Sequence, residues 1–175
     1  MNERKWEEEL VRRLTKLADP HAPNRGVLSR LRRALTAPVY VGLTGTNGLF
    51  RMVPNKAEER AVLAAALFAW TKGALRHTPD VNFGVAFGAG LTEEGKQQRE
   101  KRFIDLLDTD WEDLPYKLRQ AVALIGAADV GLDWALLIRH LGHWSHPERW
   151  VQKEWARGYW TFDETEKATA NAQAE

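Results

Sequence analysis

The sequence predicts an all-α protein of two small packed helical bundles, with about seven to nine helices. Apolar residues recur at helical spacing through most of the 175 residues, and the alternation typical of strands is nearly absent. Hydrophobic residues make up 44% of the chain and charged residues 28%, which is ordinary for a globular protein that buries a core. Residues 61–70 form the longest apolar run, about half the length of a bilayer span. We therefore expect a cytoplasmic protein without membrane contact, since the first residues also lack the apolar region of a signal peptide.

The first bundle is expected over residues 1–92. Residues 4–17 predict a helix, because an apolar stripe runs through Trp6, Leu10, Leu14 and Leu17. Asn24 is placed to cap a second helix that ends near residue 35. The glycine-rich residues 38–54 are either a packed loop or a short hairpin. Asn55 and Glu58 have the spacing of a capping box, and the helix after them should run to about residue 76 as the central buried helix.

The second bundle is expected over residues 93–162. One helix should cover residues 93–108, and two more should begin after Asp113 and Asp133 as N-caps. Ser145 and Glu148 again have capping-box spacing, which predicts a last helix to about residue 160. Most tryptophans lie on apolar stripes and should pack in the core. Residues 163–175 have no apolar stripe, so we expect a disordered polar tail.

Basic residues are concentrated in one part of a nearly neutral chain. Residues 20–57 contain no carboxylate, and residues 20–79 hold nine basic residues against two acidic ones, although the whole chain has a net charge of only +1. An excess of this size on a neutral protein indicates a surface that faces a polyanion.

The helix predicted over residues 24–35 carries most of this argument. At about 100° per residue, its apolar side chains gather on one arc and its arginines on the opposite arc. Arg25, Arg30, Arg32 and Arg33 should therefore share one solvent-facing surface. Like charges at this spacing repel each other, so the pattern indicates a function, and guanidinium groups suit bidentate contacts with phosphate. The structural alternative is that the fold supplies carboxylate partners, such as those of residues 105–113.

Other cations are weaker candidates for the same role. They lie in the predicted central helix and in the later helices: Lys72, Arg76, Lys101, Arg102, Arg119 and Arg139. Phosphate contacts from such residues would position a strand and make its binding salt-dependent, but they would not read its sequence.

Signals for catalysis or for a bound metal are weak. His140, His143 and His146 are spaced as H-x2-H-x2-H, but a helix start at Ser145 would separate them and no matching carboxylates follow, so ring stacking on tryptophan is expected. The chain has no cysteine, and its glycine-rich segment lacks the G-K-[ST] ending of a phosphate-binding loop. We therefore expect no enzymatic activity, no cofactor and no metal.

Several motifs resemble those of one known family. They occur in a fixed order between about residues 6 and 160: L-x-R-L-R-R-A-L (Leu28 to Leu35), K-R-F-x-x-L-L (Lys101 to Leu107), L-P-x-x-L-R (Leu114 to Arg119), L-D-W-x-x-L (Leu132 to Leu137) and V-x-x-x-W-A-x-x-Y-W (Val151 to Trp160). Each motif alone is weak, but their order and spacing together resemble the CasB-type small subunit of type I-E CRISPR Cascade complexes. Residues 38–54 and the polar tail depart from the family pattern.

The resemblance implies an all-helical subunit without enzymatic activity. Members of the family pair head-to-tail within a guide-RNA complex, where basic surfaces hold the crRNA, the target DNA and the displaced strand and stabilise the R-loop. The arginines of residues 24–35 then become the best candidates for nucleic-acid contacts. Two other hypotheses remain: an adaptor whose basic face docks an acidic protein, and an HD-like metallohydrolase, which elemental analysis of the purified protein would reveal.

Overall fold

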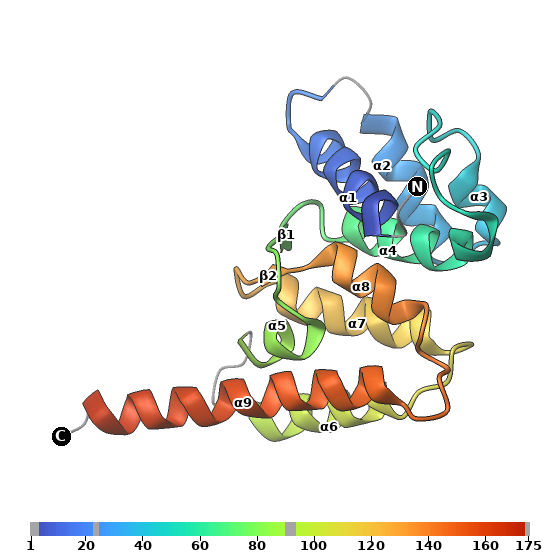
Figure 1. Cartoon of the computed structure of the whole chain (residues 1–175). Coiled ribbons are helices and arrows are strands. Elements are labelled where there is room, and N and C mark those ends of the chain that lie inside the picture. The colour runs from blue at the N-terminus through green and yellow to red at the C-terminus, as the bar shows by residue number, and fades with distance from the viewer. Residues whose placement is uncertain (1–3, 23–24, 90–93, 174–175) are drawn as a thin grey trace.

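The computed structural model of the protein describes the backbone of residues 4–22, 25–89 and 94–173 (Figure 1). Nine α-helices and one pair of two-residue strands are found in these ranges, so the all-α class is confirmed. Figure 1 shows two groups of helices, α1 to α4 and α5 to α9, stacked on each other. Their buried side chains form one continuous core.

The first group consists of four helices around α4. Their bounds are α1 (Arg4–Ala18), α2 (Arg25–Ala34), α3 (Val39–Leu43) and α4 (Glu58–Trp70), with a 3₁₀ turn η1 (Asn55–Ala57) before α4. Every side chain from Ala61 to Ala69 is buried, because α4 contacts α1, α2 and α3 on one side and α7 and α8 on the other. The prediction of a central buried helix is confirmed.

The predicted ends of α4 are wrong. Asn55 makes no capping hydrogen bond, because the 3₁₀ turn that it opens places Ala57 at the N-cap. The helix ends at Trp70, because Lys72 and Gly73 have left-handed backbone angles, with φ of 54° and 82°. The segment of residues 38–54 is a short helix followed by turns rather than a hairpin, and Asn47, with φ of 54°, makes one of these turns.

The second group packs five helices in layers. They are α5 (Phe83–Ala89), α6 (Lys96–Leu107), α7 (Leu114–Gly126), α8 (Trp134–Leu141) and α9 (Trp150–Gln173). α5 packs mainly on α9, through the stacked rings of Phe83 and Trp155, whose centroids lie 4.5 Å apart. It therefore lies with the later helices, although the predicted boundary at residue 92 would place it in the first bundle.

Two of the predicted caps in this group do not form, and the last helix differs at both ends. Asp113 precedes α7 without a capping hydrogen bond. The capping box at Ser145 is wrong, because turns continue to Arg149, whose φ is 49°, and α9 begins at Trp150. The backbone then stays helical to Gln173, where a disordered tail was expected from residue 163.

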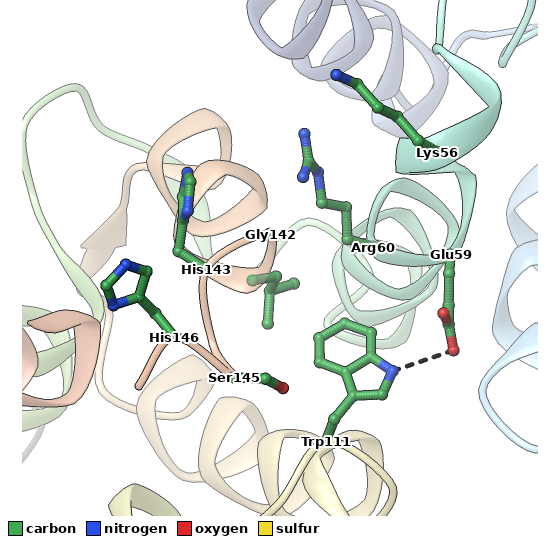
Figure 2. Close-up of a pocket in the computed structure, with 9 residues that line it drawn as sticks. Lys56, Glu59, Arg60, Trp111, Gly142, His143, Ser145 and His146 are labelled. Atoms are coloured by element: carbon green, nitrogen blue, oxygen red, sulfur yellow. Dashed lines mark hydrogen bonds between the residues drawn. The ribbon is translucent and has the colours of Figure 1, made fainter. Parts of the chain in front are cut away.

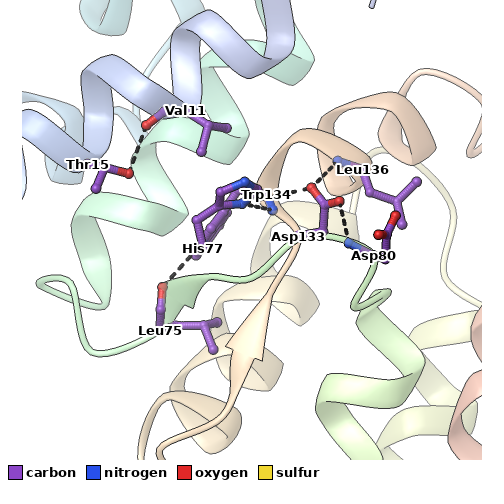
Figure 3. A network of polar contacts seen from close by, with 8 residues as sticks. All are labelled: Val11, Thr15, Leu75, His77, Asp80, Asp133, Trp134 and Leu136. Atoms are coloured by element: carbon purple, nitrogen blue, oxygen red, sulfur yellow. Dashed lines mark hydrogen bonds and ion pairs between the residues drawn. The ribbon is translucent and has the colours of Figure 1, made fainter.

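Asp133 caps α8 as predicted and also joins distant segments (Figure 3). Its carboxylate accepts hydrogen bonds from the backbone N–H of Leu136, at 2.9 Å, and of Asp80, at 3.0 Å. The indole N–H of Trp134 donates to the carbonyl of Leu75 at 3.0 Å. Beside these contacts, strand β1 (Arg76–His77) pairs in parallel with β2 (Gly131–Leu132). Backbone and side-chain hydrogen bonds together therefore hold the chain where it passes from the first group of helices to the second.

Candidate nucleic-acid interface

Helix α2 lies on α4 with its apolar side inward, as its sequence pattern predicts. Val27, Leu31 and Ala34 are buried, whereas Arg30, Arg32 and Arg33 are not. The separation of apolar and basic arcs is therefore confirmed at the level of burial.

The arginines of α2 differ in how far they are exposed. Arg33 is exposed, whereas Arg30 and Arg32 are half-buried. Arg30 turns toward the turns after α3, where its guanidinium donates to the hydroxyl of Thr44 at 2.9 Å. The Nε of Arg32 is shielded from solvent and has no hydrogen-bond partner among the described residues. Arg25 begins α2, but its side chain lies outside the described part of the structure.

The neighbouring helix α1 shows how this fold neutralises arginines elsewhere. The carboxylate of Glu9 accepts hydrogen bonds from Arg12, at 2.6 Å, and from Arg13, at 2.7 Å, which lowers the pKa of Glu9 to about 2. Among the side chains that the structure describes, those of residues 6–22, 26–89 and 94–161, no carboxylate forms an ion pair with Arg30, Arg32 or Arg33. The α2 arginines thus keep donors for an external anion.

The two cations predicted in the central helix lie after it instead. Lys72 is an exposed residue of the turn that ends α4, and Arg76 lies in β1. Arg76 forms an ion pair with Asp129 at 3.2 Å, and both side chains are largely exposed. An exposed pair of this kind adds little stability, but it occupies the guanidinium that was expected to be available.

The remaining predicted cations come from three different helices. Lys101 and Arg102 are exposed on α6, and Arg139 is half-buried on α8. Arg119 lies on α7, where its guanidinium carbon is 5.5 Å from the ring centroid of Trp70 and 5.6 Å from that of Tyr116. Figure 1 places α2 and α6 at opposite ends of the molecule, so the structure does not bring all the predicted cations together.

A pocket between the two groups of helices was not predicted from the sequence (Figure 2). Its volume is about 460 Å³, and it is lined by Lys56, from the 3₁₀ turn η1, and by Arg60, from the first turn of α4. Trp111, from the α6–α7 connection, and His143, from the α8–α9 connection, line other sides. Both cations contribute to the basic excess of residues 20–79, but only the fold shows that they line one pocket with an indole ring from a later segment.

The histidine motif brings His140 and His143 to the same ring, because both contact Trp150. His140 is buried, and its Nδ1 accepts a hydrogen bond from the indole N–H of Trp155 at 2.8 Å. The ring centroids of His143 and Trp150 lie 5.3 Å apart, but the rings are tilted by 49°, so the two residues are in contact without the stacking expected for His143. No group of three or more potential metal-binding side chains occurs in the described residues.

His140 should make the protein sensitive to acid. Burial, and then the charge of Arg139, lowers the pKa of His140 from 6.5 to about 4. Between these values the unfolded chain binds a proton that the folded chain does not, so the free energy of unfolding should fall by up to about 3 kcal/mol as the pH drops from 6.5 to 4. Urea unfolding across this range should show a clearly smaller decrease for His140→Gln, which cannot titrate. An equal decrease in both proteins would contradict this role of His140.

None of the helices, within the residues described, is long and apolar enough to cross a membrane. This finding agrees with the short apolar runs of the sequence.

Comparison with known proteins identifies relatives over most of the chain. The family model of the CRISPR-associated protein Cse2 matches residues 25–160. The Cse2 protein of Thermus thermophilus is 39% identical over 109 residues, an alignment that spans 60% of this chain and 59% of that relative.

Solved structures share the fold. CasB of M. ruber is 28% identical, with a TM-score of 0.74 over 94% of this chain and 97% of that one. A chain of a CRISPR RNA-guided surveillance complex has a TM-score of 0.76 at 23% identity, over 95% of this chain and 98% of that one. The resemblance to the CasB-type small subunit of Cascade is thus confirmed, and the chain belongs to the CRISPR-associated protein Cse2 family.

Proposed function

We propose that this protein is a non-catalytic subunit of a Cascade-type antiviral complex, in which it binds the backbones of the crRNA, the target DNA and the displaced strand and stabilises the R-loop. The observation that carries the proposal is the α2 surface, defined as Arg30, Arg32 and Arg33, which has no carboxylate partner among the described residues. The similarity to a chain of a CRISPR RNA-guided surveillance complex supports the same setting.

The α2 surface suits the energetics of such a complex. R-loop formation exchanges one duplex for another of nearly equal stability, so a few contacts to the strand backbone are enough to shift the balance. Guanidinium groups supply these contacts as charge-assisted hydrogen bonds to phosphate oxygens, and they act on any sequence. The structure therefore needs no base-reading element for the role that we propose.

The proposal includes other Cascade subunits as partners and a second copy of the chain, paired head-to-tail. Its support is membership of the Cse2 family. Native mass spectrometry of the assembled complex measures the copy number, and a single copy per complex would contradict the pairing.

Binding to single strands should depend on salt but not on sequence. If the α2 surface contacts three phosphates, the logarithm of the binding constant should fall with the logarithm of the salt concentration with a slope of about −2. Fluorescence anisotropy with labelled oligonucleotides of about 20 nucleotides and several compositions measures this slope. Strong preference for one sequence would count against backbone binding.

The alternative is an adaptor whose α2 surface docks an acidic protein. Retention on heparin together with no binding of any oligonucleotide at low salt would favour the adaptor. The same result would overturn the nucleic-acid proposal, because phosphate contacts are strongest at low salt.

A further inference from the structure

The pocket between the two groups of helices combines cations with an aromatic wall (Figure 2). Lys56, in the 3₁₀ turn η1, and Arg60, in the first turn of α4, line one side. Glu59 is the one carboxylate among the lining residues, and it accepts a hydrogen bond from the indole N–H of Trp111 at 3.1 Å. The lining residues thus carry two cations and one carboxylate, and this net positive charge favours an anion.

Arg60 is held in place but keeps donors for a ligand. Its guanidinium carbon lies 5.6 Å from the ring centroid of Trp6, and its Nε is shielded from solvent without a hydrogen-bond partner among the described residues. Gly142, after α8, leaves room for this side chain, because a Cβ atom at Gly142 would lie 2.0 Å from Nη1 of Arg60. The position of the Arg60 guanidinium therefore depends on a glycine there.

The α8–α9 connection adds further polar groups to the pocket. The Nδ1 of His146 accepts a hydrogen bond from the backbone N–H of Glu148 at 3.3 Å. In a neutral ring this bond leaves the proton on Nε2, which can donate to a phosphate oxygen. Ser145 lines the pocket beside it and carries a hydroxyl donor.

We infer that this pocket binds one nucleotide of a single strand, with its phosphate on Arg60 and its base against Trp111. A volume of about 460 Å³ can hold one nucleotide, and a pocket lined by both an indole ring and a guanidinium suits a base with its phosphate better than a carboxylate side chain. The inference rests on the proposed function and deepens it, because it adds a base-stacking contact, indifferent to sequence, to the backbone contacts of α2.

A glycine substitution tests the pocket without touching the α2 surface. Gly142→Ala should displace the flexible end of Arg60 while the backbone stays in place, since Gly142 has ordinary helical angles. We expect it to bind an oligothymidylate of about twelve nucleotides about fivefold to tenfold more weakly than the unmodified protein. Gly126→Ala is the matched control, because its Cβ would be 3.9 Å from the nearest atom, the Cγ2 of Thr71.

The base contact is tested with a probe of the same charge. A chain of abasic sugar phosphates of equal length should bind the unmodified protein several-fold more weakly than oligothymidylate, because it has no base to stack on Trp111. Ultraviolet cross-linking of the unmodified protein to oligothymidylate that contains 5-bromodeoxyuridine should label the peptide with Trp111. This measurement does not depend on how well a variant folds.

The results separate failure of the pocket from failure of the proposed function. If Gly142→Ala binds normally and the label falls elsewhere, while Arg33→Glu binds weakly, the pocket inference is overturned and the α2 surface stands. If the unmodified protein binds neither oligothymidylate nor the abasic chain at low salt, the proposed function fails and the pocket inference fails with it.

Discussion

Reversing the charges of Arg30 and Arg33 should weaken the binding of single-stranded oligonucleotides about a hundredfold at low salt. The Arg30→Glu, Arg33→Glu double variant removes two guanidinium groups that have no carboxylate partner among the described side chains, and it places two carboxylates beside the strand. The salt dependence should weaken as well, by about 0.7 in the slope for each lost phosphate contact. Fluorescence anisotropy at several salt concentrations measures both effects.

A second double variant tests whether affinity depends on where the charges lie or only on the net charge of the protein. Lys153→Glu with Arg157→Glu changes the net charge by the same amount, and both residues are exposed on α9, far from α2 in Figure 1. We expect this variant to lose much less affinity. Equal losses in both variants would mean that net charge alone decides binding, and the α2 surface would have no special role. Circular dichroism should verify the fold of the first variant, because Arg30 also bonds to Thr44.

Replacing Gly84 with alanine should lower the free energy of unfolding by about 3 kcal/mol or more. A Cβ atom at Gly84 would lie 1.8 Å from the backbone carbonyl oxygen of Trp155. Backbone cannot move aside as a side-chain end can, so α5 and α9 would have to separate and part of the contact between the rings of Phe83 and Trp155 would be lost. Urea unfolding measures the change, and the melting temperature should fall by roughly 10 °C.

Gly126→Ala again provides the control for Gly84→Ala. The Cβ would make only an ordinary contact there, at 3.9 Å, and the position lies at the end of α7. Its free energy of unfolding should change by about 1 kcal/mol or less. Similar stability of the two variants would show that the approach of α5 to α9 is looser than the structure indicates.

The sequence predicts best those features that depend on residues close together in the chain. The apolar arc of α2 is read from the spacing of Val27, Leu31 and Ala34, and all three are buried. The cap at Asp133 is likewise local, since its carboxylate bonds to the N–H three residues later. The all-apolar character of residues 61–69 predicts a helix with neighbours on every side, which α4 has.

The ends of helices are predicted less well, because the same few residues can adopt more than one local conformation. The spacing of Asn55 and Ser145 suits a capping box at each position, but the chain forms a 3₁₀ turn after the first and tight turns after the second. The end of α4 depends on the left-handed angle of Lys72, which a residue with a Cβ atom adopts only when the tertiary structure holds it.

In the candidate site, too, the residues that lie close together in the chain are predicted and those that lie far apart are not. Arg30, Arg32 and Arg33 are found from the sequence because one helix carries them all. The pocket joins Arg60 to Trp111 and Gly142, which come from segments far apart in the chain. Periodicity and charge counts contain no information about such contacts, and only the fold brings the three residues together.

The position of α4 has a consequence for how the protein would move inside an assembly. This helix contacts the other helices of its own group and also α7 and α8 of the second group, so the described part of the chain has one continuous core. We therefore expect the subunit to move as one rigid body. A ligand held at α2 and a neighbour docked at α6 would then keep a constant separation. Any rearrangement of the assembly would move this rigid body as a whole, and the distance between its two ends would not change.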